Sequence, residues 1–130
     1  MINLGETYTN NYIVSEKIYI GFQELFNDKN PLHTDKSYAI SKGFIDRVMY
    51  GNILNGFISH FIGESLPIKN VIIHSQQIKF IKPIYLNDNL TFQAIADEIF
   101  TSVSVIKFKC HFTNSLNQKV AKGVIQIGCI

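Results

Sequence analysis

The pattern of apolar and polar positions in this 130-residue chain changes its period near residue 70. Before that point, apolar residues recur three or four positions apart, which predicts amphipathic helices. After it, apolar and polar residues alternate every second position, which predicts strands with one buried face. The chain therefore belongs to the α+β class, with helices first and an antiparallel sheet afterwards.

Two helices are predicted before residue 45. The first begins at Ser15 and ends near Asn27, because Ser15 is a favourable cap and an apolar stripe follows it at helical spacing. The stripe consists of Ile18, Phe22, Leu25 and Phe26. A short amphipathic segment over 35–42 follows and ends at Gly43.

The most apolar helix is predicted over residues 52–65, before Pro67. Its apolar residues lie on two adjacent tracks, and a face of that width predicts burial. They are Ile53, Leu54, Phe57, Ile58, Phe61 and Ile62. Gly56 lies inside this helix, at a cost of about 1 kcal/mol relative to alanine. Either simple tolerance or the close approach of a backbone or ligand accounts for that glycine.

Four long strands are predicted after residue 70. They cover residues 71–84, 90–96, 104–112 and 121–129, with a hairpin turn at 114–118. A series of long strands after one buried helix predicts a sheet wrapped around that helix. Such a sheet has open edges, and pairing with a second copy of the chain would cover one of them.

Composition predicts one globular domain over residues 1–130, since 46% of the residues are apolar and 17% are charged. A net charge of +2 and a single arginine argue against a nucleic-acid-binding surface. Cys110 and Cys129 are expected to be free thiols in a reducing compartment. No secretory signal or membrane-spanning stretch is evident, so we expect a cytoplasmic protein with no membrane partner.

The stretch from Asp28 to His33, DKNPLH, carries the most informative chemistry. Pro31 disfavours helix at the preceding residue, so a turn is predicted here. A turn can bring Asp28 and His33 toward one point, and a converging carboxylate and imidazole suit proton transfer. The alternative is that Asp28 caps a turn and His33 is an ordinary surface histidine.

Four stretches in fixed order resemble one known family. They are Asp28–His33, which matches D-x-N-P-L-H; Phe44–Gly51, which resembles F-x-x-x-I-x-H-G; Leu54, Gly56, Ser59, Gly63 and Leu66-Pro67; and Phe80–Asp88, which resembles F-x-x-P-V-x-x-G-D. Together they resemble the MaoC-like hydratases, also called (R)-specific enoyl-CoA hydratases, between about residues 15 and 90. The resemblance implies a hotdog fold, in which an antiparallel sheet wraps a central helix and a loop-helix segment overhangs.

The resemblance also implies an activity. It is the reversible syn addition of water to a trans-2-enoyl-CoA or enoyl-acyl-carrier-protein, which gives an (R)-3-hydroxyacyl thioester; the enzyme would be a hydro-lyase. Asn27, Tyr50 and Asn87 differ from the usual residues of the family. Tyr50 stands where a histidine usually precedes the glycine, which bears on the range of substrates.

The site residues follow from the resemblance. Asp28 and His33 would be catalytic, and Gly51 would donate its backbone N–H to an oxyanion or serve only as a tight turn. Asn30 would hold the water or the loop. Ser59 would bond Asp28 as a supporting residue or bond back to its own helix.

No cofactor is implied, and no metal site is expected from His60, His74 and His111. The expected partners are the thioester substrate and a second copy of the chain, in a homodimer or higher oligomer. Two alternatives stay open: a hotdog acyl-CoA thioesterase, and a non-catalytic hotdog subunit that supports the site of another chain.

Overall fold

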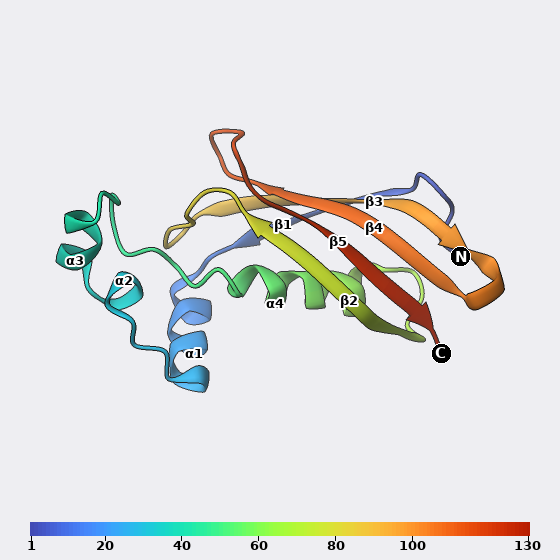
Figure 1. Ribbon diagram of the computed structural model, residues 1–130, viewed down its shortest axis with the longest axis horizontal. Helices are drawn as coiled ribbons and strands as arrows, with labels where there is room; N and C mark the ends of the chain where they lie inside the picture. The colour runs from blue at the N-terminus through green and yellow to red at the C-terminus, as the bar shows by residue number, and fades with distance from the viewer.

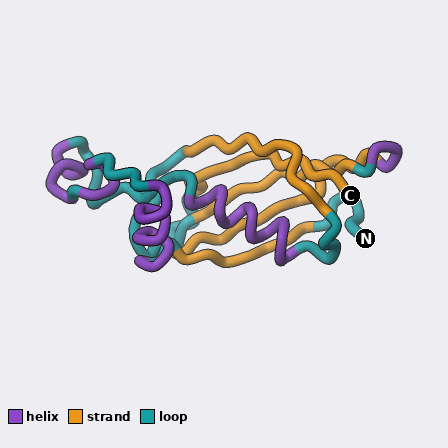
Figure 2. The backbone as a smooth tube through the Cα atoms, turned by 90° about the horizontal axis from the view of Figure 1, so that it is seen from below, coloured by secondary structure: helices purple, strands orange, loops and turns teal.

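The computed structural model describes all residues 1–130, which form a five-stranded antiparallel sheet with a helix along one face (Figures 1 and 2). The elements, in chain order, are β1 (Thr7–Ile13), α1 (Glu16–Phe26), α2 (Pro31–Thr34), α3 (Lys36–Ser41), α4 (Ile53–His60), the π-helical turn η1 (Phe61–Ser65), β2 (Val71–Phe80), β3 (Asn89–Phe100), the 3₁₀ turn η2 (Thr101–Val103), β4 (Val105–Thr113) and β5 (Lys119–Cys129).

The strands lie in the order β1-β3-β4-β5-β2, so that β1 and β2 form the two edges. Figure 2 shows α4 lying over the strands, which confirms the predicted sheet around a central helix. Figure 1 shows α1, α2 and α3 together at one end of the molecule, with both chain termini at the other end. The overhanging loop-helix segment is therefore confirmed as well. None of the helices has the length and apolar character needed to cross a membrane.

The core lies between α4 and the sheet and forms one cluster of 25 buried residues. Phe61 packs against Phe92 of β3 with ring centroids 4.9 Å apart, and Phe92 packs against Phe112 of β4 at 4.8 Å. No polar or charged residue is buried. Each buried phenylalanine contributes about 1.5–3 kcal/mol through its removal from water, so the aromatic cluster is a main source of stability.

Helix α1 forms as predicted. The Ser15 side chain accepts a hydrogen bond from the backbone N–H of Ile18 at 3.2 Å, which caps the helix start. Asn27 ends the helix with φ of +53°, in the left-handed region where asparagine often replaces glycine. Asn27 thus delivers Asp28 directly after the helix, as the sequence indicates.

The two ends of α4 are held differently. At its carboxyl end, Asn10 Nδ2 donates to Ser65 Oγ at 2.6 Å, and Lys69 Nζ donates to the carbonyls of Gly63 and Glu64. At its amino end, Asn52 makes no side-chain cap hydrogen bond. The η1 turn that continues the helix is therefore tied to β1 and to the following loop, whereas the first turn of α4 has a single side-chain tie, from Gln76 Nε2 of β2 to Asn55 Oδ1 at 2.7 Å.

Two elements differ from the sequence-based prediction. Residues 7–13 form the edge strand β1, which the pattern did not indicate because its inward positions, Tyr8, Asn10 and Tyr12, are polar or amphipathic. The stretch at Pro31 is not only a turn: residues 31–34 form the short helix α2. Proline suits the first position of a helix, where its missing N–H costs nothing, so it started the helix that it was expected to prevent.

Candidate active site

The loop between α1 and α2 is organised by two consecutive side-chain turns. Asp28 Oδ1 accepts from the backbone N–H of Asn30 at 3.1 Å, and Asn30 Oδ1 accepts from the N–H of Leu32 at 2.9 Å. Aspartate and asparagine favour such turns because their short side chains reach the backbone two residues on. Asn30 therefore holds the loop, one of its two expected roles. The Asp28 side chain is exposed, with Oδ2 available to a ligand.

His33 lies in α2, half-buried, with its ring fixed by the backbone. Its Nδ1 lies 2.6 Å from the carbonyl oxygen of Val48. A carbonyl oxygen can only accept a hydrogen bond, so Nδ1 carries the proton of the neutral ring. Nε2 is then unprotonated and free to accept a proton from a bound molecule.

Two buried tyrosines hold the main chain at Asp28 and at His33. The Tyr50 hydroxyl donates to the carbonyl of Asp28, and its ring lies 4.3 Å from the His33 ring, centroid to centroid. The Tyr19 hydroxyl donates to the carbonyl of His33 at 2.5 Å. Burial raises the pKa of Tyr50, with smaller contributions from Tyr19 and Asp28, so its hydroxyl remains a donor. Tyr50 links the two predicted catalytic residues, although no hydrogen bond joins their side chains directly.

Sequence reasoning identified Tyr50 only as a departure from the usual residue and did not single out Tyr19. Both tyrosines lie in apolar segments, where the sequence pattern does not distinguish them from ordinary core residues. The available signal was that a buried tyrosine hydroxyl needs a hydrogen-bond partner. Here the partners are the carbonyls of the loop that carries the site.

Gly51 lies in the turn before α4 and has an unpaired backbone N–H, since no group in the chain accepts a hydrogen bond from it. A Cβ at this position would lie 3.0 Å from the Phe80 ring, which explains the glycine. Gly51 and His33 line the same cavity of about 280 Å³. Gly51, with its free donor, and His33 therefore border the same partly open cavity.

Asp28 lines a second, larger cavity of about 1150 Å³ between α1 and α4. Its walls include Ile18, Phe22 and Phe57, and Gly56 opens it, because a Cβ at Gly56 would meet nothing within 4 Å. Close approach of another part of this chain therefore does not explain Gly56. Consecutive residues line the two cavities, because Gly51 borders the smaller one and Asn52 borders the larger one. That Asp28 and His33 hold one water between them stays a prediction.

The structure does not bring Ser59 to Asp28. Ser59 lies on the exposed face of α4, beside buried Ile58, and the Asp28 carboxylate bonds the Asn30 amide instead. The helix rotation that buries the apolar tracks turns Ser59 outward.

The other histidines lie apart from one another and from the site. His60 Nδ1 lies 3.0 Å from the Tyr12 hydroxyl, His74 Nδ1 lies 3.1 Å from Gln126 Nε2, and His111 lies on β4. No group of three or more histidine, cysteine, aspartate or glutamate side chains is placed to hold a metal ion.

Several curated proteins are similar to this chain in sequence. An (R)-specific enoyl-CoA hydratase of Rhodospirillum rubrum is 35% identical over 78 residues, which are 60% of this chain and 54% of that protein. A mitochondrial 3-hydroxyacyl-[acyl-carrier-protein] dehydratase of Arabidopsis thaliana is 25% identical over 122 residues, 92% of this chain and 72% of that protein. The matched stretch thus spans about half the length of the first of these relatives. No model of a known protein family matches the chain.

Solved structures agree on the fold. The (R)-hydratase from A. caviae superposes with a TM-score of 0.90, at 19% sequence identity, over 99% of this chain and 98% of that one. A likeness at this low identity shows the shared hotdog fold. The chain is thus similar in sequence to (R)-specific enoyl-CoA hydratases and shares the fold of solved MaoC-like dehydratases, as the motifs between residues 15 and 90 indicate.

Proposed function

We propose that this protein is a hydro-lyase that adds water reversibly, in the syn sense, to a trans-2-enoyl thioester of coenzyme A or acyl carrier protein. The product is an (R)-3-hydroxyacyl thioester. The main support is that the free Nε2 of His33 and the unpaired N–H of Gly51 line one cavity. Further support is that Tyr50, whose ring packs against His33, donates its hydroxyl to the carbonyl of Asp28. The curated relatives carry the same class of activity in their names.

The Asp28–His33 pair activates water. Water is a weak nucleophile, so one of its O–H bonds must pass a proton to a base while its oxygen forms a bond to the β-carbon. The electrons of the double bond then move to the thioester oxygen as an enolate. The pair returns a proton to the α-carbon on the same face, which completes the addition without a net change in the pair.

Gly51 stabilises the enolate. Negative charge develops on the thioester oxygen in the transition state, and an unpaired backbone N–H before a helix is a fixed donor for it. Loss of one such donor typically lowers the rate about 100- to 1,000-fold. The close packing of Gly51 against Phe80 keeps this turn in place.

The acyl chain lies in the larger cavity between α1 and α4. Ile18, Phe22 and Phe57 provide an apolar wall, and Gly21 and Gly56 leave its space open. Apolar lining with a few polar groups at one end is typical of sites for small molecules. The position of Asp28 on this wall sets the β-carbon near the cavity mouth.

The active form is proposed to be a cytoplasmic homodimer in which residues 1–130 act as one domain. The single hydrophobic cluster supports the one-domain proposal. The open edge strands β1 and β2 support the proposal of a second copy, because uncovered strand edges readily pair.

The test is hydration of crotonyl-CoA and longer trans-2-enoyl-CoAs, followed by loss of enoyl absorbance. Asp28→Asn and His33→Ala should each lower kcat about 100-fold or more while the circular dichroism spectrum stays unchanged. Glu98→Gln and His60→Ala remove the same types of group at exposed positions and should retain wild-type turnover.

Two results contradict the proposal. Release of free thiol from an acyl-CoA without hydration shows a thioesterase. Folded wild-type protein that hydrates neither enoyl-CoA nor enoyl-acyl-carrier-protein indicates a non-catalytic subunit. Full turnover in both Asp28 and His33 variants would remove their assigned roles.

A further inference from the structure

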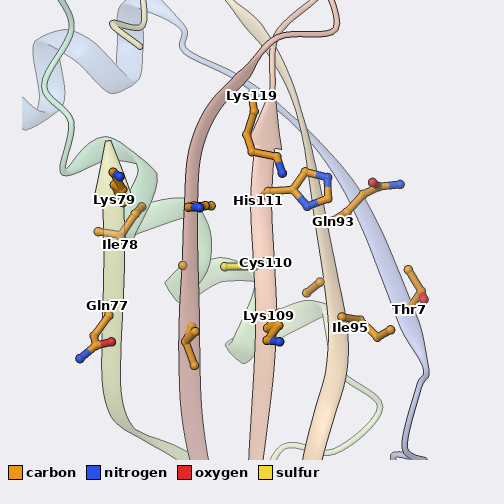
Figure 3. Close-up of a pocket in the computed structure, with 14 residues that line it drawn as sticks. Thr7, Gln77, Ile78, Lys79, Gln93, Ile95, Lys109, Cys110, His111 and Lys119 are labelled. Carbon is orange, nitrogen blue, oxygen red and sulfur yellow. The ribbon is translucent and has the colours of Figure 1, made fainter. Parts of the chain in front are cut away.

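The face of the sheet opposite α4 carries a groove of about 690 Å³ that crosses β2, β5, β4 and β3 (Figure 3). On β4, Phe108, Cys110 and Phe112 are buried toward α4. Side chains alternate along a strand, so Lys109 and His111 point to the other face. The groove therefore lies on the side of the sheet away from the helix and from the cavities that hold Asp28 and His33.

The groove is positively charged. Four lysines line it, at positions 79, 109, 119 and 122, together with His111, and no carboxylate does. Only Lys109 has an acidic partner, with its Nζ 3.6 Å from Asp97 Oδ2. The other three lysines make no ion pair in the structure.

The strand register places two of these charges directly opposite each other. Lys79 of β2 pairs with Lys122 of β5, and Lys122 pairs on its other side with His111 of β4. Like charges directly opposite on adjacent strands repel and weaken the sheet. Figure 3 shows Lys119 reaching from the start of β5 toward His111. Burial and, to a smaller extent, Lys119 lower the pKa of His111, so the ring stays neutral beside the lysines at neutral pH.

The remainder of the groove combines apolar and amide side chains with Lys109. Ile95 and Val124 are 39% and 37% exposed and form its floor, and Gly123 adds no side chain there. Gln77 and Gln93 provide amide donors and acceptors at its sides. The register thus forms two neighbouring rows across the groove: Lys79, Lys122, His111 and Gln93 in one, and Gln77, Val124, Lys109 and Ile95 in the next. Its volume lies in the range of small-molecule sites, about 300–1,000 Å³.

We infer that this groove binds an organic phosphate of the nucleotide class, with the phosphates at Lys79, Lys119 and Lys122 and the flat base over the neighbouring row of Val124, Lys109 and Ile95. Lysine ammonium groups bind phosphates as point charges. Bound phosphate offsets the repulsion between Lys79 and Lys122, which nothing else in the chain neutralises. A second copy of the chain does not suit this face, because two faces of the same charge repel. The inference does not depend on the proposed reaction.

The test is isothermal titration calorimetry of the full chain with ADP at low ionic strength. Lys79→Gln combined with Lys122→Gln should raise the Kd at least about tenfold, since contacts to charged groups are worth that factor or more. Lys107→Gln is the matched control: it removes the same charge from β4 outside the groove and should leave Kd unchanged. Added salt should weaken binding in the wild type.

Titrations with a second nucleotide distinguish the nucleotide part of coenzyme A from a free nucleotide as the ligand of the groove. Adenosine 3′,5′-bisphosphate, the nucleotide part of coenzyme A, is titrated beside ADP, and ADP is added to the hydration assay. Competition with enoyl-CoA assigns the groove to the nucleotide of the substrate; binding without competition assigns it to a free nucleotide. Both results support an organic-phosphate site. The Asp28→Asn variant should bind ADP as the wild type does, which keeps this test separate from that of the reaction.

Three results overturn the inference. They are no heat of binding for either nucleotide at millimolar concentration, an unchanged Kd in the Lys79/Lys122 double variant, and an equal loss in Lys107→Gln. Binding of an acidic protein with no nucleotide binding would assign the groove to a macromolecular partner instead.

Discussion

At the scale of single residues, the distinctive feature of the site is Tyr50. It fixes the Asp28 carbonyl through its hydroxyl and supports the His33 ring through its face. Its two contacts connect residues 28 and 33 without a direct bond between their side chains. A tyrosine at this position can therefore serve the site by holding the loop in place.

Removal of the Tyr50 hydroxyl separates these two contacts. Tyr50→Phe keeps the ring against His33 but leaves the Asp28 carbonyl without its donor. We expect kcat for hydration to fall about tenfold with little change in KM, and the free energy of unfolding to fall by about 1 kcal/mol. Steady-state kinetics and chemical denaturation measure the two effects. Tyr38→Phe, at an exposed tyrosine of α3, is the control. An unchanged kcat with reduced stability would show a purely structural role.

The sequence predicts only part of the site. Asp28, His33 and Gly51 can be proposed from their order and spacing, because the turn, the glycine and the helix start are local features. The contact proposed between Ser59 and Asp28 is not seen, because helix spacing gives the turn on which a residue lies but not which neighbour faces it. The Tyr50 hydroxyl bonds a carbonyl 22 positions away in the sequence, and the Tyr19 hydroxyl bonds one 14 positions away. Contacts over such separations depend on the packed fold.

At the scale of elements, periodicity predicts the helices and the four long strands well, because each buries one apolar face. Periodicity does not reveal β1, because Asn10 and two tyrosines face inward and find hydrogen-bond partners there. Asn10 and Tyr12, for example, bond each other at 2.8 Å. Periodicity does not reveal α2 either, because its four residues are too few to show a helical period.

The pairing of β2 with β5 depends on Gly123. A Cβ there would lie 2.3 Å from the carbonyl oxygen of Gln77, which belongs to the backbone of β2 and cannot rotate away. We expect Gly123→Ala to lower the free energy of unfolding by about 1–3 kcal/mol, the usual cost of overpacking. Gly21→Ala in α1 is the matched control, since its Cβ would meet nothing, and it should be neutral or stabilising by up to about 1 kcal/mol. Urea denaturation of both variants measures these free energies of unfolding. Equal stability of the two variants would contradict the close contact between Gly123 and the Gln77 carbonyl.

At the scale of the whole molecule, the two edge strands, β1 and β2, differ in how well they suit pairing with a second copy of the chain. β2 has 10 residues and β1 has 7, and exposed apolar side chains gather along β2 and its end. They are Ile72, Phe80 and Ile81. Burial of such residues at an interface is favourable, so β2 is the better candidate for pairing with a second copy.

A dimer of this kind links stability to concentration. Light scattering should give about twice the chain mass of 14.8 kDa, and the Tm should rise with protein concentration. Ile72→Lys on β2 should yield monomers, whereas Ile13→Lys on β1, at a side chain of nearly equal exposure, should not. Monomers of the wild type, or dissociation by Ile13→Lys alone, would point away from β2.

The unequal anchoring of the central helix has a consequence for motion. Three hydrogen bonds from Asn10 and Lys69 fasten the η1 turn at its carboxyl end, whereas the end beside Gly51 has no side-chain cap and one tie, from Gln76 to Asn55. Local opening begins where fewest contacts resist it. We therefore expect fraying to start at the mouth of the cavity, so that the first turn can adjust to an arriving thioester while the aromatic interior stays rigid.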